Sequence, residues 1–379
     1  MKKAFEHNFR LGVLGGGQLG RMLIQSAIDF NLTFTILDPD PHAPCSLLGD
    51  FHCGALTDYD TVMKFGRSCD IMTIEIENVN TEALTDLAKA GKHVYPQPEL
   101  IALIQDKRTQ KNFFRDCGIP TAEFILTGNR QDVLENEDFL PAVQKLGREG
   151  YDGRGVQLLR TKADLEKSFD SPGILEKLID FRKEIAIIVA RSPGGEVVSY
   201  PPVEMIFHPV QNLVEYLFSP AQLEPSVLRH ADAVARRVAT ELGIAGLLAV
   251  EMFITTEGEV LVNEIAPRPH NSGHQTIESN VTSQYEQHLR AILDLPLGET
   301  TLICPSAMVN LLGEPEHNGP ARYAGFEEVL GLSGAHIHLY GKRFTKPYRK
   351  MGHVTIVDND TERLKAKVNF VKQTLKVIA

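Results

Sequence analysis

Two glutamates on either side of a short turn have the types and spacing to bind a divalent cation. Glu251 lies in the apolar run Leu247–Ile254. Glu264 lies in the next such run, Glu259–Ile265, and Gly258 falls in the turn between them. If the two runs form a hairpin, the two carboxylates share one sheet face about 5 Å apart, where they repel unless a cation or proton lies between them. The pattern predicts a Mg²⁺ site; the simpler alternative is a pair of solvated acids.

A dense polar loop follows the second run directly. Arg268, His270, Asn271 and His274 fall within a stretch that also contains two prolines and a glycine, which exclude a regular helix or a central strand. Such a loop after a metal-binding strand is typical of a site for a small anion and a polar substrate. A zinc site at His270 and His274 would need a helix, and the prolines argue against one.

Two glycine-rich segments have patterns that bind phosphate groups. Gly15–Gly20 reads G-x-G-x-x-G after the apolar run Arg10–Leu14, and Asp38 closes the next run, as in a dinucleotide-binding turn. Prolines after Asp38 leave little room for the ribose of a dinucleotide. The alternative is that the glycines only permit a tight turn and bind no ligand. Gly150–Gly155 lies between two expected strands, so it is no Walker loop, but a glycine-rich hairpin can cover a triphosphate with Lys145 nearby. An ordinary hairpin is the alternative there.

The densest positive charge of the chain lies near its C-terminus. Six basic residues stand among glycines and a proline: Lys342, Arg343, Lys346, Arg349, Lys350 and His353. A shaped basic loop suits a substrate phosphate, because arginine matches phosphate oxygens with two parallel hydrogen bonds. A solvated basic surface is the alternative.

The expected helices and strands fall into three blocks along the chain. In residues 1–117, short apolar strands alternate with amphipathic helices, which predicts a Rossmann-like α/β domain with a parallel sheet. Residues 118–300 are richer in strands and contain one clear helix, Pro225–Leu242, which predicts an α+β domain. Residues 301–379 predict a small β-rich domain that ends in a helix. A length of 379 residues suits two or three domains.

Composition excludes several classes of protein. A net charge of −10, with 39 basic and 49 acidic residues, argues against a nucleic-acid binder or an anionic-membrane binder. No apolar run approaches the roughly 18 residues of a membrane span, and no signal peptide is evident. The five cysteines are scattered without a CxxC pair, so we expect free thiols and a cytoplasmic protein.

Four motifs in chain order together resemble the N5-carboxyaminoimidazole ribonucleotide synthetase family, the ATP-grasp carboxylases of bacterial and fungal purine synthesis. They are Gly15–Met22, Gly150–Gly155, Asn263–His274 and Arg349–His353. The third motif is the most specific and the first the least. The resemblance implies an ATP-grasp fold with an N-terminal pre-ATP-grasp domain and a small C-terminal domain. It also implies that ATP phosphorylates bicarbonate to carboxyphosphate, and that carbon dioxide or the mixed anhydride itself is captured by the amine of 5-aminoimidazole ribonucleotide.

The resemblance further implies roles for single residues. Contacts to ATP are expected from Lys107, Lys145, Gly150, Tyr151, Asp152, Gly153, Arg154, Gly155, Val156, Glu176, Lys177, Leu178, Ile179, Glu184, His208, Asn263 and Glu264. The Mg²⁺ ligands are Glu251 and Glu264. The catalytic residues around bicarbonate and carboxyphosphate are Arg268, His270, Asn271 and Lys346. The ribonucleotide is expected to contact Gln18, Leu19, Glu77, Tyr151, Asp152, Lys346, Arg349 and Lys350. Many family members carry arginine at the position of Lys107, which leaves the charge in place.

Other functions remain open from the sequence. A related ATP-grasp enzyme, such as formate-dependent glycinamide ribonucleotide transformylase or biotin carboxylase, would share the nucleotide site and use another acceptor. A nicotinamide-dependent oxidoreductase would use Gly15–Gly20 but leaves the glutamate pair unexplained. We expect the amides of that turn to face the ribonucleotide and not NAD. Family members are commonly dimers, so a homodimer is expected.

Overall fold

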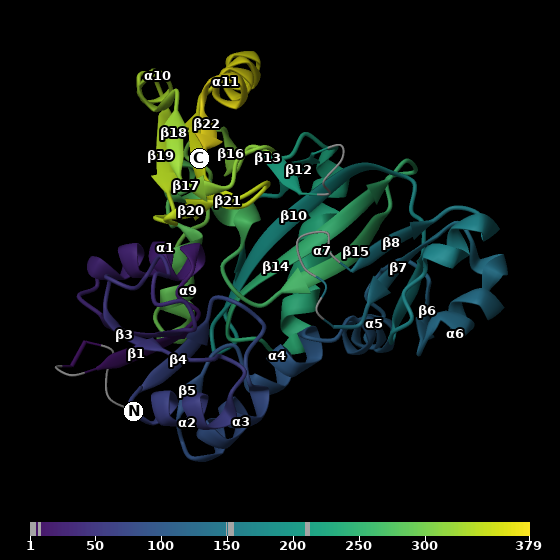
Figure 1. The fold of residues 1–379 in the computed structure, drawn as a ribbon, viewed down its shortest axis with the longest axis horizontal. Coiled ribbons are helices and arrows are strands. Elements are labelled where there is room, and N and C mark those ends of the chain that lie inside the picture. The colour runs from purple at the N-terminus through teal and green to yellow at the C-terminus, as the bar shows by residue number, and fades with distance from the viewer. Residues whose placement is uncertain (1–4, 7–8, 149, 151–154, 209–212) are drawn as a thin grey trace.

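The computed structural model describes residues 5–6, 9–148, 150, 155–208 and 213–379 of the chain. Figure 1 shows an N-terminal block at the lower left, a small sheet at the right and a C-terminal block at the top, arranged around a long central sheet. The predicted combination of α/β and α+β parts is therefore confirmed.

The N-terminal block is a parallel sheet with the strand order β3-β2-β1-β4-β5. Its strands are β1 (Arg10–Leu14), β2 (Thr33–Asp38), β3 (Asp50–Cys53), β4 (Ile71–Ile74) and β5 (His93–Val94). Its helices are α1 (Gln18–Ile28), α2 (Tyr59–Arg67) and α3 (Thr81–Lys89), followed by α4 (Pro98–Ile104) and α5 (Lys107–Asp116). Because β1 and β4 are parallel neighbours, the residues that follow them meet at one edge of the sheet.

A small antiparallel sheet with the order β6-β9-β7-β8 follows. Its strands are β6 (Phe124–Thr127), β7 (Ala142–Leu146), β8 (Val156–Leu159) and β9 (Gly173–Lys177). The helical segments beside it are α6 (Arg130–Glu135), η1 (Glu137–Phe139) and η2 (Lys162–Lys167). Its core is small and consists of Val133, Ala142, Leu159, Leu165 and Leu175.

The largest sheet has nine strands, in the order β15-β14-β10-β12-β13-β16-β21-β19, with β11 paired to β10. Its strands are β10 (Phe181–Arg191), β11 (Val197–Ser199), β12 (Val203–Phe207), β13 (Val214–Ser219), β14 (Gly246–Thr255), β15 (Val260–Ala266), β16 (Ser306–Leu312), β19 (Ala335–Leu339) and β21 (Lys350–Val357). The pairing of β13 with β16 carries this sheet across the expected domain boundary near residue 300.

Helices enclose the large sheet and tie it to the other blocks. Along α7 (Pro225–Leu242), the apolar residues Ala231, Val234 and Val238 pack into the core that contains β10 and β14. Helix α9 (Gln284–Ile292) lies between the sheet and α1 of the N-terminal block. The remaining elements are η3 (Asn271–Gly273), α8 (Thr276–Ser279), β17 (Gly319–Pro320), β18 (Arg322–Ala324), α10 (Phe326–Leu330), β20 (Phe344–Thr345), α11 (Thr361–Thr374) and β22 (Lys376–Ile378).

Most predicted elements are present, with shifts of one to three residues at their ends. The predicted helix Pro225–Leu242 has the same bounds as α7, with Gly243 in the left-handed conformation that ends it. Strands β12 and β13 and helix α9 were not predicted. Prolines interrupt the sequence around β12 and β13. In α9, buried polar residues such as Gln284 and Gln287 weaken the apolar pattern by which the helix could be predicted.

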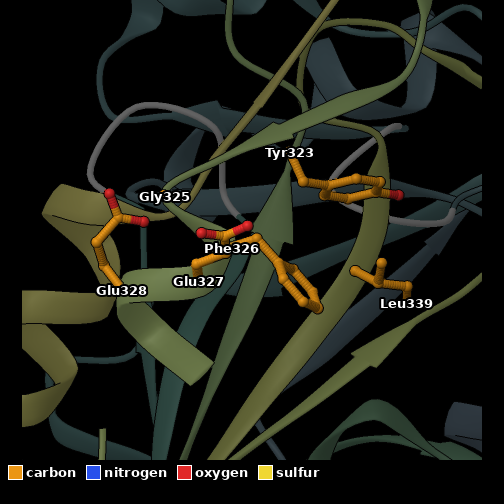
Figure 2. A pocket seen from close by; sticks show the side chains of 6 residues that line it. All are labelled: Tyr323, Gly325, Phe326, Glu327, Glu328 and Leu339. Carbon is orange, nitrogen blue, oxygen red and sulfur yellow. The ribbon is translucent and has the colours of Figure 1, made fainter. Parts of the chain in front are cut away.

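Two further features of the molecule lie away from these motifs. Among the described residues, no helix combines the length and the apolar character needed to cross a membrane. A cavity of about 470 Å³ lies in the C-terminal block, where Tyr323, Phe326 and Leu339 line it beside two acidic side chains (Figure 2). It contains none of the predicted site residues.

Candidate active site

The two glutamates at the predicted metal site oppose one another as expected. Strands β14 and β15 pair antiparallel with Glu251 directly across from Glu264, so this prediction is confirmed. The Glu251 side chain is 13% exposed and that of Glu264 is 41% exposed, so the pair is open on the Glu264 side. Burial, with Glu264 and Glu184 close by, raises the pKa of Glu251 well above its usual value.

Glu184 adds a third carboxylate to this region from the neighbouring strand β10. Burial and the charge of Glu264 raise the pKa of Glu184 to about 7. Glu264 itself stays ionised, because the Lys107 ammonium lowers its pKa to about 2. The three acids therefore differ in charge at neutral pH, and one of them depends on a lysine.

Two predicted phosphate-binding lysines lie beside the carboxylates. Lys107 Nζ is 2.5 Å from Glu264 Oε2. Lys145 Nζ donates to Asn263 Oδ1 at 2.8 Å and forms an ion pair with Glu176 Oε2 at 2.5 Å. Both ammonium groups thus reach residues of β15 from other parts of the chain, which places positive charge next to the acidic strand pair.

A buried lysine that sequence reasoning missed completes this network. Lys111 forms an ion pair with Glu176 and a hydrogen bond with Thr121. Burial lowers the pKa of Lys111 to about 8. Although burial alone would raise the pKa of Glu176, Lys145 and Lys111 outweigh it and hold that pKa below its usual value. The available signal was the spacing of Lys107 and Lys111, four residues apart on one helix.

Residues 176–179, expected to contact ATP, have few backbone amides without a partner. The amide of Lys177 donates to the Glu123 carbonyl, and the amide of Leu178 donates to the Pro141 carbonyl. The Glu176 side chain points into the lysine network described above. Among the described residues of the stretch 177–179, only the amide of Ile179 makes no backbone hydrogen bond, and its expected contact with ATP stays a prediction.

The glycine-rich flap lies largely outside the described residues. This applies to Tyr151, Asp152, Gly153 and Arg154, so their expected contacts stay predictions. At the flap's described edge, Val156 pairs with Lys145 across β7 and β8. Gly155 has φ +70°, a left-handed conformation that favours glycine.

The polar loop after β15 brings its residues to both sides of the acidic pair. His270 Nε2 lies 3.5 Å from Glu251 Oε1. Arg268 Nε lies 2.8 Å from Glu77 Oε1 of the N-terminal block. Asn271 exchanges two hydrogen bonds with Asn310 of β16. Residues from all three blocks thus meet around one short loop.

Three amides of the N-terminal glycine turn bind the chain's own carboxylates, so the expectation that they face the ribonucleotide is wrong for Gly16, Gly17 and Gly20. Gly17 and Gly20 donate to the Glu75 carboxylate at 2.8 and 2.9 Å, and Gly16 donates to Asp38 Oδ2 at 2.7 Å. The chain's own carboxylates therefore occupy the place of a pyrophosphate. The cause is the adjacency of β1 and β4, which brings Glu75 over the turn.

Two predicted substrate residues in this turn differ in their surroundings. The side chain of Leu19 is buried in the core of the N-terminal block, so only its backbone could meet a substrate, and the expected contact stays a prediction. Gln18 begins α1 and is half-buried, so part of its side chain is open to a ligand.

The basic C-terminal loop lies on the same side of the molecule as the acidic pair. Lys350 is close enough to Glu251 to oppose the effect of burial and neighbouring acids on that pKa. Arg349 donates to the Phe344 carbonyl at 2.7 Å, and Lys346 is exposed. His208 packs edge-on against Tyr348 of this loop, with ring centroids 5.9 Å apart, and its expected contact with the nucleotide stays a prediction.

The donors around Glu251 and Glu264 fit a magnesium ion. Both are carboxylates on facing positions, and Asn263 directly precedes Glu264 in the sequence. Burial and two neighbouring acids are the main causes of the raised pKa of Glu251. A hard divalent cation bound there would offset this excess of buried negative charge. Glu264 remains partly exposed, so a nucleotide phosphate would have access to an ion held there.

Three family models match consecutive parts of the chain. The ribonucleotide synthetase preATP-grasp domain matches residues 9–105, and the ATP-grasp domain matches residues 112–285. The phosphoribosylaminoimidazole carboxylase C-terminal domain matches residues 306–367. These matches follow the three blocks in order.

Whole-chain relatives agree with the domain matches. The N5-carboxyaminoimidazole ribonucleotide synthase of Bacillus subtilis is 38% identical over 92% of this chain and 91% of its own length. The crystal structure of N5-carboxyaminoimidazole ribonucleotide synthetase from Thermotoga maritima has a TM-score of 0.91 and 39% identity, and covers 98% of this chain and 99% of its own. A synthase from Aspergillus clavatus, in complex with ADP and 5-aminoimidazole ribonucleotide, has a TM-score of 0.87 and 32% identity, covering 96% and 98%.

Proposed function

The chain belongs to the family of N5-carboxyaminoimidazole ribonucleotide synthases, and from this premise we propose how its residues divide the reaction. The enzyme is an ATP-grasp ligase that carboxylates 5-aminoimidazole ribonucleotide in purine synthesis. ATP transfers its γ-phosphoryl group to bicarbonate, which gives ADP and carboxyphosphate. The carbon of that anhydride, directly or as carbon dioxide, forms a bond with the exocyclic amine, and phosphate and a proton leave.

One observation carries this assignment of roles, the approach of His270 to Glu251. Because the two side chains lie 3.5 Å apart, the loop expected to hold bicarbonate is next to the expected metal ligands. A phosphoryl group bound near Glu251 and Glu264 would therefore face an anion held by Arg268, His270 and Asn271. Such closeness is what transfer between two bound substrates needs.

We propose that Glu251 and Glu264 hold Mg²⁺, with Asn263 beside them. When bound, the ion would neutralise the charge that develops on the transferred phosphoryl group. Lys107 and Lys145 already lie at the same strand pair, so on nucleotide binding each can exchange its carboxylate or amide partner for a phosphate oxygen. The cationic Arg268 would stabilise the anhydride.

We assign the ribonucleotide to the space between the N-terminal block and the basic C-terminal loop. Glu77 and Gln18 face it from one side, and Lys346, Arg349 and Lys350 supply the positive charge for its phosphate from the other. Bicarbonate as the carboxyl source, a homodimer and a cytoplasmic location also belong to this proposal. The free state of all five cysteines agrees with a reducing compartment. We keep residues 1–117, 118–300 and 301–379 as the proposed domains.

The decisive experiment measures ATP turnover with bicarbonate, with and without 5-aminoimidazole ribonucleotide. We expect ADP, phosphate and the carboxylated ribonucleotide in equal amounts when all three substrates are present. Labelled bicarbonate should enter the product. Product formation that requires formate in place of bicarbonate would assign the chain to another ATP-grasp reaction, and phosphate release without any carboxylated product would contradict the proposal.

A further inference from the structure

A row of three polar side chains crosses the C-terminal part of the large sheet. His338 of β19 is the register partner of His353 of β21, and His353 is the partner of Asn310 of β16. Directly opposed residues on neighbouring strands face the same side of a sheet. The row therefore presents two imidazoles and one amide side by side on one face, whereas the alternating residues Val309, Val354 and Ile337 belong to an apolar core on the other face.

The amide at one end of the row is paired with the polar loop. Asn271 Nδ2 donates to Asn310 Oδ1 at 2.9 Å, and Asn310 Nδ2 donates back to Asn271 Oδ1 at 3.0 Å. Asn310 Nδ2 also donates to the Val214 carbonyl at 2.8 Å. This third bond fixes which end of the Asn310 amide is nitrogen, and the reciprocal pair then fixes the Asn271 amide as well.

The imidazoles of the row support the other end of the loop. His274 stacks on His353 with ring centroids 4.7 Å apart, and His353 stacks on His338 at 4.4 Å with an angle of 10° between the rings. Burial lowers the pKa of both His274 and His353 well below the usual value. Both rings are therefore neutral near pH 7, so the stack brings no like charges together.

Fixed partners hold each ring of this stack in place. The Tyr285 hydroxyl lies 2.9 Å from His274 Nδ1, and the Tyr340 hydroxyl lies 3.0 Å from His353 Nδ1. His338 Nε2 lies 2.6 Å from Glu278 Oε1. The row is thus a firm support, whereas the loop that rests on it has little regular structure of its own beyond the short turn η3.

We propose that Asn310 is a positioning residue for the carboxylation step, because it sets the orientation of Asn271 toward the carboxyphosphate; this rests on the proposed function. With one N–H of Asn271 committed to Asn310, the second N–H has a fixed direction for an anion oxygen. Asn310 lies on a strand, and among the described residues its side chain hydrogen-bonds to the loop only through Asn271, so it acts through that residue. His353 and His338 keep the loop seated from its far end.

The proposal has a consequence for how ATP consumption is coupled to carboxylation. Lys107, Lys145 and the acidic pair bind ATP without help from Asn310. If Asn271 loses its orientation, carboxyphosphate can still form but is held less well, and it is short-lived in water. Phosphate would then be released without carboxylated product. A residue with a merely structural role would lower both products together.

The test compares three variants with the wild type. Asn310→Leu removes the amide at similar size. Asn310→Asp keeps the size but replaces the donor with an oxygen that faces the Asn271 and Val214 oxygens. Thr355→Val is the matched control, because Thr355 is buried on the same sheet and its hydroxyl has no hydrogen-bond partner among the described residues. For each protein, carboxylated ribonucleotide and phosphate are measured together at several bicarbonate concentrations.

Both Asn310 variants should form about tenfold less carboxylated product per phosphate, the effect of losing about one hydrogen bond to an aligned group. Their Michaelis constants for ATP should stay within about twofold, and Thr355→Val should match the wild type. A wild-type product-to-phosphate ratio in a folded Asn310→Asp protein overturns the inference, as does equal uncoupling by Thr355→Val. If Asn310→Leu fails to fold, Asn310→Asp decides. A wild-type enzyme that forms no carboxylated product instead refutes the proposed function, and this inference with it.

Discussion

Glu77 of the N-terminal block and Arg268 of the central block form an ion pair, with Oε1 and Nε 2.8 Å apart. Glu77 follows β4 and Arg268 follows β15, so the contact joins the carboxyl end of the parallel sheet to the polar loop. Neither side chain is more than about a quarter exposed, at 23% and 19%. Glu77, which we assign to the ribonucleotide, thus already holds Arg268, which we assign to carboxyphosphate.

We predict that Glu77→Gln lowers kcat/KM for the ribonucleotide by roughly 10- to 150-fold, the effect of losing a charge-assisted hydrogen bond worth about 1.5–3 kcal/mol. The Michaelis constant for ATP should barely change, because Lys107 and Lys145 bind that substrate. Steady-state titration of each substrate checks this. Glu82→Gln, at an exposed position of α3, is the control and should behave as wild type. Equal losses for ATP and the ribonucleotide would contradict the assignment.

The two opposed glutamates should respond differently to amidation. Without Mg²⁺, burial and the neighbouring acids Glu264 and Glu184 raise the pKa of Glu251 well above its usual value, so its ionised form contributes little to the folded state. Glu251→Gln should therefore leave the free energy of unfolding nearly unchanged. Glu264→Gln should destabilise the protein, because it leaves the Lys107 ammonium without its partner. Relief of repulsion between the two acids, which the sequence alone suggests, is outweighed by this lost ion pair.

Both amidated variants should nevertheless lose at least about 10²-fold in turnover, since each removes a Mg²⁺ ligand. Urea unfolding without metal and turnover across a Mg²⁺ titration give the two readouts. Near-normal turnover by a folded Glu264→Gln protein would refute the metal assignment. An equal loss of stability in both variants would refute the assigned charge states.

Positive charge in the C-terminal loop should affect one substrate only. Lys346→Ala and Arg349→Ala should raise the Michaelis constant for the ribonucleotide by about 10- to 150-fold and leave that for ATP nearly unchanged. Arg349 also donates to the Phe344 carbonyl, so its variant can disturb the loop, whereas exposed Lys346 reports charge alone. Arg343→Ala, an exposed position in the same basic cluster, serves as the control. If Lys346→Ala has no effect on either Michaelis constant, Lys346 belongs to a solvated basic surface and does not bind the substrate phosphate.

Stability should fall steeply in acid because of buried neutral histidines. Burial lowers the pKa of His288 to about 3, and its Nε2 lies 2.8 Å from the Thr73 hydroxyl. The unfolded chain binds the proton near pH 6.5, so this contribution is complete above that pH and is lost as the pH falls toward 3. The slope is about 1.4 kcal/mol per pH unit, or about 2 kcal/mol between pH 6.5 and 5.

Urea unfolding at pH 7 and pH 5 measures this loss. His288→Gln, which can still hydrogen-bond to Thr73, should show a flatter dependence than the wild type. His42→Gln, at an exposed histidine, should keep the wild-type slope. The same slope in all three proteins would mean that His288 is not the group responsible.

Local patterns in the sequence predict the hairpin chemistry well. The opposition of Glu251 and Glu264 depends only on the turn between two strands, so their spacing is sufficient. Contacts between blocks are different in kind. The pairs Glu77–Arg268 and Asn271–Asn310 join residues 191 and 39 positions apart, and nothing in the local pattern fixes how the blocks pack. The expectation that the glycine amides face a ligand failed for the same reason, because Glu75 approaches the turn from another strand.

The ladder between β13 and β16 has a mechanical consequence. Four register pairs, from Tyr216–Val309 to Ser219–Ser306, tie the C-terminal strands to the central ones, so the carboxylates and the basic loop belong to one rigid plate. Opening between them would require breaking the ladder. The four-stranded sheet β6–β9 is separate (Figure 1), so it is the part that can swing over the nucleotide. We therefore expect the ribonucleotide to find its binding surface ready before ATP arrives, while ATP closes its own site.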